Sequence, residues 1–294
     1  MKKSAEHFQR IGLIGNADKA ACAASVRAAV RLIRRAGRKI FCDAATGRLA
    51  GLKVEALPDA ATLARKTDLL LVFGGDGTML RTARQFAGSP TPMLGVNIGG
   101  LGFLTAVPSD KLAEALKRLW AGEFKFEARA LIEASGKGHG HAIRQTALND
   151  VVISRGAVSR LISLDVSVDG EPVTRYRCDG LIISSPTGST AYSLAAGGPI
   201  VLPTAEVFAL TPICPHALTN RSIILPLSAT LRIKLASTSL ETIVSADGEV
   251  IGSLEANDEI TIRRSESAVR LVHLKDGSFL EALRQKLHWR GTYL

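Results

Sequence analysis

The hydrophobic period changes once along this chain of 294 residues, and that change constrains the fold more than any other feature. Before Pro108, short apolar segments alternate with helical stretches. After it, most segments alternate apolar and polar residues with a period of two. Apolar strands separated by helices are typical of a parallel sheet covered on both faces, and alternation is typical of antiparallel strands. The sequence therefore predicts two domains of different architecture.

The first domain is expected to be an α/β domain with a parallel sheet, spanning residues 1–107. Its strands are predicted in the segments RIGLIGN, RKIFCD, TDLLLVF and PMLGVNIG. Its first helix is predicted from about Lys19 to Ala36, and Gly37 is expected to end it because glycine adopts the left-handed conformation of a helix C-terminus.

The second domain is expected over residues 108–276, as a mostly antiparallel β-rich domain that begins with the helix SDKLAEALKRLWAG. Two hairpins are predicted, with turns at Asp169-Gly170 and Asp247-Gly248, because Asp-Gly is favoured in tight hairpin turns. Further strands are predicted in SATLRIKLAS and EITIRRSESAVRLVHL. A C-terminal helix, at about 277–294, is predicted and could pack back on the first domain.

The net charge of +10 comes mostly from the N-terminal region, where the first 40 residues hold ten Lys and Arg against Glu6 and Asp18. The arginines from Arg27 to Arg38 recur every three or four residues and predict a solvated stripe on one helix face. A positive field also favours anionic substrates. Aromatic residues make up only 5% of the chain and do not interleave with basic ones, so no nucleic-acid partner is expected.

The sequence carries no sign of a membrane or secretory protein. No apolar run approaches the roughly 18 residues of a membrane span. The start, MKKSAEHFQR, is basic but lacks the apolar region of a signal peptide. The four cysteines show no C-x-x-C spacing, so reduced thiols are expected. These features predict a cytoplasmic protein without a membrane partner.

The loop GGDGT, which follows a wholly apolar strand, is the main candidate site. Glycines let the backbone approach a ligand closely, and successive N–H groups together with a helix starting near Thr78 would form a phosphate cradle. Asp76 would repel the phosphates that such a cradle attracts. It therefore faces either a metal that accompanies the phosphates or a hydroxyl group that attacks phosphorus. A tight turn with Asp76 as a helix cap is the alternative without a catalytic role.

Three further stretches are candidate parts of the site. GVNIGGLGFLT, from Gly95 to Thr105, is a second glycine-rich loop that could lie beside the first. Asn149-Asp150 precedes an apolar strand and suits a ribose diol or an amide, although a plain turn explains it equally well. The segment RCDGLIISSPTGSTAYSLAAGGPI has small residues that let a planar ligand approach the backbone, and Tyr192 offers a stacking face.

Taken together, these stretches closely resemble the bacterial NAD kinase family. The resemblance runs from the first strand through GGDGTML, GVNIGGLGFLT, ALNDVVI, DGLIISSPTGSTAYSLAAGGPI and TPICPHAL to the closing KLHW. GGDG alone is shared with diacylglycerol, sphingosine and some sugar-phosphate kinases, whereas TGSTAYSLAAGGP is specific to this family. The family fold has an α/β domain carrying GGDGT and a β-rich domain carrying the TAYS motif, with the active cleft between them.

The resemblance implies a kinase that uses ATP and a divalent metal to phosphorylate the 2′-hydroxyl of the adenosine ribose of NAD, giving NADP. It also implies dimers or tetramers. Mg²⁺ is expected to arrive with ATP, and no residue of the chain is expected to be a metal ligand. In the family, an arginine where Arg177 stands goes with a preference for NAD over NADH.

The resemblance also assigns the residues of the site. Asp76 matches the catalytic carboxylate. The substrate-binding positions, for NAD and ATP, are matched by Gly74, Gly75, Gly77, Thr78, Asn149, Asp150, Arg160, Arg177, Asp179, Thr190, Ala191, Tyr192, Ser193, Leu194, Ala195 and Glu249. Two of them depart from relatives, since Asp150 stands where family members often have Glu, and Glu249 where some have Gln.

Other classes of protein fit less well. A lipid kinase sharing GGDGT needs an apolar slot or a membrane-facing surface, and no apolar amphipathic anchor is evident. Loss of Asp76 would have supported a non-catalytic nucleotide sensor, but Asp76 is present. A dehydrogenase of the dinucleotide-binding type would carry the G-x-G-x-x-G fingerprint, which is missing.

Overall fold

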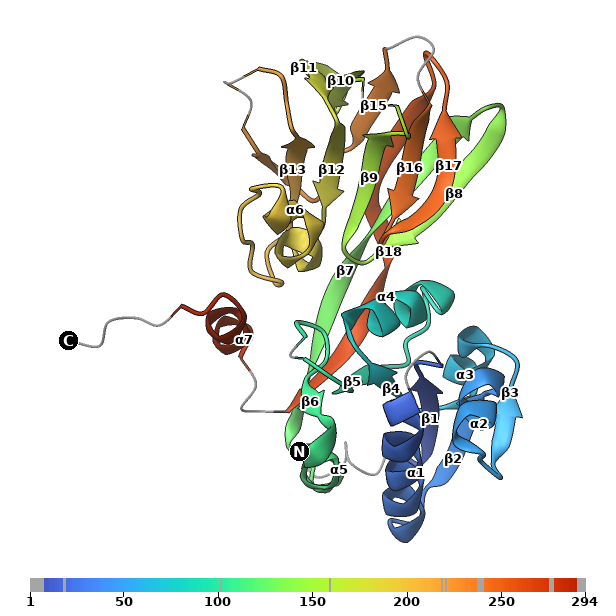
Figure 1. Cartoon of the computed structure of the whole chain (residues 1–294). Helices are drawn as coiled ribbons and strands as arrows, with labels where there is room; N and C mark the ends of the chain where they lie inside the picture. Colours follow the sequence, from blue (N-terminus) through green and yellow to red (C-terminus); the bar gives the residue numbers. More distant parts are fainter. Residues whose placement is uncertain are drawn as a thin grey trace, which may run out of the picture. The chain divides into compact units, whose positions relative to one another are not determined.

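A computed structural model of the chain describes residues 8–17, 20–100, 102–158, 160–217, 219, 221–236, 241–274 and 278–289. The chain forms two compact units (Figure 1). Unit 1 comprises the described residues as far as Ala128 and from Val269 onward, and unit 2 spans Arg129–Ala268. Two long strands, β7 (Phe124–Gly138) and β18 (Glu259–Leu274), each contribute to both units.

Unit 1 is built on the predicted parallel sheet. In spatial order its main strands are β5 (Met93–Asn97), β4 (Leu69–Gly74), β1 (Arg10–Gly15), β2 (Lys39–Asp43) and β3 (Glu55–Leu57). All of these neighbours pair in parallel, and β6 (Val107–Pro108) and the end of β18 add parallel pairs to β5. The order of the strands reverses between β1 and β4, and ligands of open parallel sheets bind at such a point.

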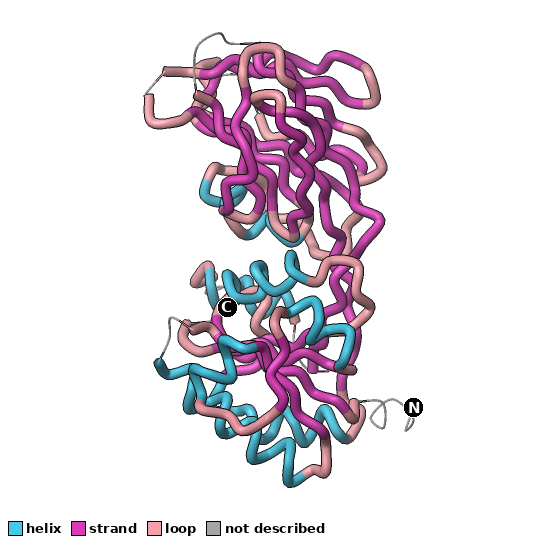
Figure 2. Tube along the Cα trace, turned by 90° about the vertical axis from the view of Figure 1, so that its right-hand side faces the viewer, coloured by secondary structure: helices cyan, strands magenta, loops and turns pink. Residues whose placement is uncertain are grey.

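Most of the helices belong to unit 1, as Figure 2 shows. They are α1 (Ala20–Arg35), α2 (Ala44–Ala50), α3 (Ala60–Lys66), α4 (Asp76–Gln85), the 3-10 helix η2 (Ser109–Lys111), α5 (Leu112–Trp120) and α7 (Phe279–Lys286). Ile11 and Leu13 of β1 lie in one core with α1 and α5. A Cβ on the intervening Gly12 would meet Leu63 of α3, so helices cover both faces of the sheet, as predicted.

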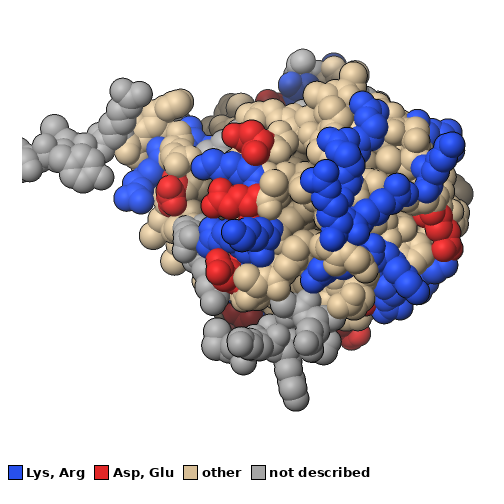
Figure 3. Space-filling model, turned by 90° about the horizontal axis from the view of Figure 1, so that it is seen from below, with Lys and Arg blue, Asp and Glu red and all other residues tan. Residues whose placement is uncertain are grey.

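Helix α1 confirms the prediction made from its arginine spacing as far as Arg35. Its apolar side is buried, as at Val26 and Ile33, and Gly37 follows it with φ +71°. Arg27, Arg31, Arg34 and Arg35 are exposed. Lys and Arg side chains are numerous on the face of the molecule seen in Figure 3. From Arg27 to Arg35 the stripe is therefore a solvated helix face, whereas Arg38 lies after the helix, half-buried, with its guanidinium 3.8 Å from the centroid of the Trp120 ring.

The boundary between the units differs from the sequence expectation of residues 107 and 108. The helix expected at the start of the β-rich domain is α5, and it belongs to unit 1. Its buried residues Leu112, Leu116 and Leu119 share a core with α1. This apolar side is what attaches α5 to the parallel sheet. α7 also belongs to unit 1. It ends at Lys286, earlier than predicted, and residues 290–294 of the predicted helix lie outside the described part.

Four short elements of unit 1 were not predicted, namely α2, β3, α3 and the two-residue strand β6. The two helices have seven residues each, too few for a clear hydrophobic period. Each begins with an aspartate cap, since Asp43 accepts a hydrogen bond from the N–H of Thr46 and Asp59 from that of Thr62. Asp followed three residues later by Thr was the available signal.

Unit 2 is an antiparallel β-rich unit with two sheets around one core. One sheet holds, in spatial order, β14 (Ile223–Pro226), β13 (Val207–Ile213), β12 (Gly180–Ser184), β9 (Asp150–Arg155), β16 (Thr242–Ala246) and β17 (Glu249–Leu254). The other strands are β8 (His141–Ala147), β10 (Ile162–Val168), β11 (Glu171–Cys178) and β15 (Leu231–Leu235), with the unit 2 parts of β7 and β18. The chain also forms a 3-10 helix, η3 (Thr187–Thr190), and α6 (Tyr192–Ala195).

Both hairpin turns are where the sequence predicts them. Asp169 and Gly170 join β10 to β11 with φ of 51° and 90°. Asp247 and Gly248 join β16 to β17 with φ of 49° and 81°. Two positive φ values in succession are typical of the type I′ turn that suits the twist of paired strands. Within the described residues, no helix is long and apolar enough to cross a membrane.

Candidate functional site

The GGDGT loop leaves the buried strand β4 at the carboxyl edge of the parallel sheet, beside the point where the strand order reverses. Helix α4 begins at Asp76, slightly earlier than the predicted start near Thr78. A Cβ on Gly74 would lie 2.2 Å from Oγ1 of Thr78, so only glycine lets the helix start this close to the strand end. The loop therefore packs closely against the N-terminus of α4, and its role as a phosphate cradle stays a prediction.

The carboxylate of Asp76 does not cap its own helix, because Gly75 occupies the cap position and no side chain caps it. Its Oδ2 accepts a hydrogen bond of 2.8 Å from the N–H of Phe103, and its Oδ1 one of 3.0 Å from the N–H of Leu104. A carboxylate oxygen has room for a second hydrogen bond. The side chain is 29% exposed. Asp76 is thus oriented by the backbone while it keeps acceptor capacity that a ligand can use.

The second glycine-rich loop lies against the first, as expected. The N–H of Ile98 donates to the carbonyl of Gly74 over 2.9 Å. A Cβ on Gly102 would lie 2.1 Å from Oδ1 of Asp76, so the close approach of this loop requires glycine. Leu101, which precedes Gly102 in this loop, lies outside the described residues. Gly102 is therefore a residue of the Asp76 site that sequence reasoning noted only as part of a motif.

The second cluster of predicted residues is in unit 2, where Asn149 and Asp150 form the turn into β9. The Asp247 carboxylate accepts hydrogen bonds from the N–H groups of Leu148 over 2.9 Å and Asn149 over 2.7 Å. A weaker bond of 3.3 Å comes from the N–H of Asp150. Sequence reasoning used Asp247 only as a turn residue. The structure shows that its side chain also holds the Asn149-Asp150 turn.

Asp150 is buried, with 5% of its surface exposed. Burial, and next the charge of Asp247, raises the pKa of the Asp150 carboxyl to about 7. Loss of water around a carboxylate and a nearby negative charge both penalise its ionised form. Asp150 therefore titrates close to neutral pH, where an exposed aspartate is fully ionised.

The small-residue stretch after β12 packs directly on this turn. The N–H of Ser185 donates to the carbonyl of Asn149 over 2.8 Å. A Cβ on Gly188 would lie 2.1 Å from the same carbonyl oxygen, which leaves glycine as the only residue that fits without movement. The hydroxyl of Ser189 donates to the carbonyl of Pro186 and accepts from the N–H of Val201. This network fixes the backbone that precedes the TAYS motif.

The residues of the TAYS motif differ in exposure. Tyr192 is 48% exposed. Ser193 is buried, and its hydroxyl is 3.1 Å from that of Thr211, so its side chain serves the interior of unit 2. Thr190, Ala191 and Leu194 are half-buried, and Ala195 is exposed.

Some predicted residues lie away from Asn149. Asp179 accepts a hydrogen bond of 2.7 Å from Nε of Arg155, at the far end of β9 from Asp150. Because an extended strand rises about 3.3 Å per residue, Asp150 and Arg155 lie roughly 17 Å apart along β9. Arg177 is exposed on β11, and Arg160 is exposed before β10. Glu249, in contrast, is exposed next to the turn of Asp247 at the Asn149 end.

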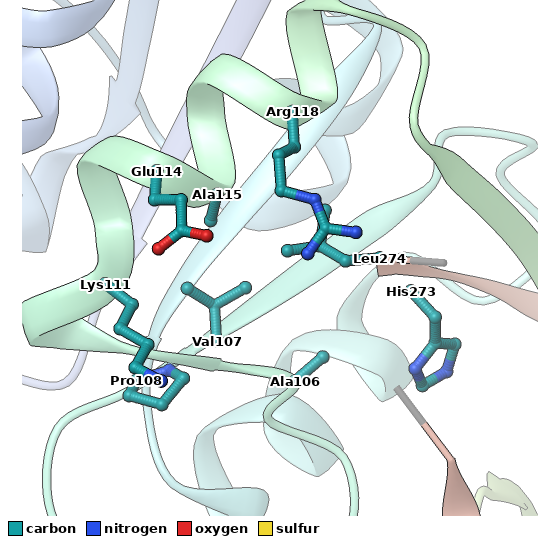
Figure 4. Close-up of a pocket in the computed structure, with 9 residues that line it drawn as sticks. All are labelled: Ala106, Val107, Pro108, Lys111, Glu114, Ala115, Arg118, His273 and Leu274. Carbon is teal, nitrogen blue, oxygen red and sulfur yellow. The ribbon is translucent and has the colours of Figure 1, made fainter. Parts of the chain in front are cut away.

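Two pockets of unit 1 contain none of the predicted site residues. One, of about 240 Å³, is shown in Figure 4, where Lys111, Glu114 and Arg118 lie on one side and His273 of β18 on another. The other, of about 720 Å³, is lined by residues of α3 and the loop after α4. Among the described residues, no group of three or more His, Cys, Asp or Glu side chains is arranged to hold a metal ion.

Comparison with known proteins gives a consistent result over nearly the whole chain. Residues 11–124 match the ATP-NAD kinase N-terminal domain, and residues 148–274 match the ATP-NAD kinase C-terminal domain. The NAD kinase of Syntrophotalea carbinolica is 39% identical over 283 residues, 96% of this chain and 99% of that protein. The NAD kinase of Methylibium petroleiphilum is 39% identical over 99% of this chain and 98% of its own length.

Solved structures agree with these matches. Yeast NADH kinase complexed with NADH has a TM-score of 0.87 at 26% identity and covers 98% of this chain and 89% of its own. An NAD kinase from Archaeoglobus fulgidus in complex with ATP has a TM-score of 0.76 at 25% identity and covers 96% of this chain and 100% of its own. With both of its units matched and near-complete relatives at 39% identity, this chain belongs to the NAD kinase family.

Proposed function

We propose that the protein transfers the γ-phosphoryl group of ATP to the 2′-hydroxyl of the adenosine ribose of NAD, with Asp76 as the residue that receives the proton. The observation that carries this proposal is the Asp76 carboxylate, held by two backbone N–H groups at the mouth of a glycine cradle. The solved relatives in complex with NADH and with ATP bind ligands of the same two classes.

In the proposed reaction, the 2′-oxygen of the ribose forms a bond to the γ-phosphorus of ATP. The bond from that phosphorus to the bridging oxygen breaks, and ADP leaves. The hydroxyl proton passes to the carboxylate of Asp76. An ordinary carboxylate is too weak a base to ionise a sugar hydroxyl beforehand. Asp76 therefore orients the hydroxyl first and accepts its proton late in the transfer.

The phosphates are proposed to lie over the loop formed by Gly74, Gly75, Gly77 and Thr78, where backbone N–H groups and the N-terminus of α4 face an anion. The divalent cation, Mg²⁺, is proposed to arrive as the complex with ATP. It would supply charge neutralisation for the phosphoryl group.

NAD is proposed to bind through residues of unit 2. Asn149 and Asp150 would hydrogen-bond its polar groups, and the exposed ring of Tyr192 would stack on a planar base. The small side chains of the TAYS run would let the planar ligand approach the backbone closely. The remaining proposed contacts are Arg160, Arg177, Asp179, Thr190, Ala191, Ser193, Leu194, Ala195 and Glu249.

Three finer properties belong to the same proposal. Arg177 would favour NAD over NADH. The protein would assemble as a homodimer or homotetramer. It would act in the cytoplasm.

An end-point assay tests this function. Purified protein, Mg-ATP and either NAD or NADH are incubated in parallel, and the product is read with an enzyme specific for NADP(H). Product from NAD alone supports the kinase and the proposed role of Arg177. Product from both cofactors keeps the kinase and rejects that role. No product from either rejects the proposal with ATP as donor.

A further inference from the structure

The C-terminal helix α7 packs on the loop that orients Asp76, within unit 1. The rings of Phe279 and Phe103 are 5.9 Å apart between centroids. At the other end of α7, the Nζ of Lys286 lies 4.2 Å from the centroid of the Phe103 ring and 3.9 Å from Oδ2 of Asp76. The last residue of α7 thus places a cation at the mouth of the glycine cradle.

The ammonium group of Lys286 makes no hydrogen bond to Asp76. The two amide hydrogen bonds already orient the carboxylate, and 3.9 Å is too long for a hydrogen bond. Within the described part of the chain, Asp76 is the only carboxylate at ion-pair distance from Lys286. The lysine side chain is 27% exposed, and its ammonium group carries three N–H donors.

A cation at this position explains why a phosphate cradle tolerates a carboxylate. Asp76 alone would repel the polyphosphate of ATP, and Lys286 cancels that charge at close range. During phosphoryl transfer, negative charge is spread over the oxygens of the moving group, and a fixed cation stabilises it. Stability of the fold is a weaker explanation, because a partly exposed ion pair and a single contact between an ammonium group and an aromatic ring each contribute little.

We propose that Lys286 is a further residue of the phosphoryl-transfer site, which pairs with Asp76 in the free protein and binds a phosphate oxygen of ATP in the complex. The flexible four-carbon stem of lysine allows its head group to move from one partner to the other. The proposal rests on the proposed function of the Asp76 loop. Lys286 would thus contact ATP, the phosphate donor, and α7 would make no contact with NAD.

The test compares three variants of the full-length protein. Lys286→Met removes the charge but keeps the length, Lys286→Arg keeps the charge, and Arg284→Met removes an exposed cation from the same helix as a control. The measurements are kcat, KM for ATP and for NAD, thermal midpoint, and calorimetric affinity for a non-hydrolysable ATP analogue with Mg²⁺. Lys286→Met should lower kcat/KM for ATP by about 10- to 100-fold, the loss expected for a hydrogen bond to a charged group.

The same variant should bind the ATP analogue more weakly and keep its KM for NAD and its thermal midpoint. Lys286→Arg should recover much of the lost activity, and Arg284→Met should behave as wild type. Wild-type kinetics in Lys286→Met would overturn the proposal. So would equal losses toward ATP and NAD with a lowered midpoint, which indicate a packing role. If the wild-type protein transfers no phosphoryl group, the proposed function fails, and analogue binding by Lys286→Met still decides the role of Lys286.

Discussion

The Oδ1 atom of Asp247 accepts a 2.7 Å hydrogen bond from the backbone N–H of Asn149, across 98 positions of sequence. Asp247 thereby ties a hairpin turn to the turn proposed to bind NAD. Asparagine tolerates the positive φ of this position, so Asp247→Asn should keep the hairpin and weaken the hold on Asn149. We expect a KM for NAD raised about tenfold, as for the loss of a hydrogen bond to a charged group, with KM for ATP unchanged.

Asp169 provides a matched control, because it occupies the same position of the other Asp-Gly turn and accepts from the N–H of Thr230 over 2.8 Å. Asp169→Asn should cost a similar amount of stability and leave KM for NAD as in wild type. Equal effects of the two substitutions on KM would contradict a specific role for Asp247.

The approach of the second glycine loop to Asp76 leads to another prediction. Gly102→Ala would place its Cβ 2.1 Å from Oδ1 of Asp76, so either the carboxylate or the loop must move. A displacement on the order of 1 Å at a reacting group can cost about 100-fold in rate. We expect kcat to fall by roughly 10- to 100-fold in steady-state assays. Gly100→Ala is the control, since its Cβ meets nothing within 4 Å. Unchanged turnover in Gly102→Ala would show that this contact is unimportant.

The titration of Asp150 predicts how stability varies with pH. Its pKa is raised to about 7 in the fold, mainly by burial, so folding disfavours its ionised form. The free energy of unfolding that this group contributes is fully present below the pKa of an aspartate in the unfolded chain, which is about 4. It is lost as pH rises through about 7. Across that window the loss is about 1.4 kcal/mol per pH unit. Asp150→Asn should remove this dependence.

The measurement is thermal unfolding of wild type and Asp150→Asn between pH 4.5 and 8 at constant ionic strength. The wild-type midpoint should decline relative to that of the variant as pH rises. Curves that stay parallel over this range would mean that Asp150 titrates as an ordinary exposed carboxyl group.

The fold followed from the sequence where the signal is local. The alternation in EITIRRSESAVRLVHL predicted a strand over the full length of β18, and both Asp-Gly turns were found from two residues each. The apolar run before GGDGT predicted β4 and the loop at its carboxyl end. These features depend on periods and turn preferences that neighbouring residues carry by themselves.

The contacts that complete the candidate site were not predictable in this way. Asp247 reaches Asn149, and Lys286 reaches Asp76, from distant parts of the sequence. Asp247 already had a sufficient explanation as a turn residue, and nothing in the sequence set Lys286 apart from Arg284, the other basic residue of α7. Only the packing of the strands and of α7 reveals which groups their side chains meet.

The most direct test of the account is the rate of NADP formation from Mg-ATP and NAD by wild type and Asp76→Asn. Asparagine keeps the size of the side chain but replaces one of the two oxygens that accept from Phe103 and Leu104 with an N–H donor, so the thermal midpoint is measured alongside to show that the variant is folded. We predict that kcat falls by about 10²- to 10⁴-fold, the usual contribution of a group that accepts a proton in the transition state. Turnover of Asp76→Asn comparable to that of wild type would contradict the central role of Asp76.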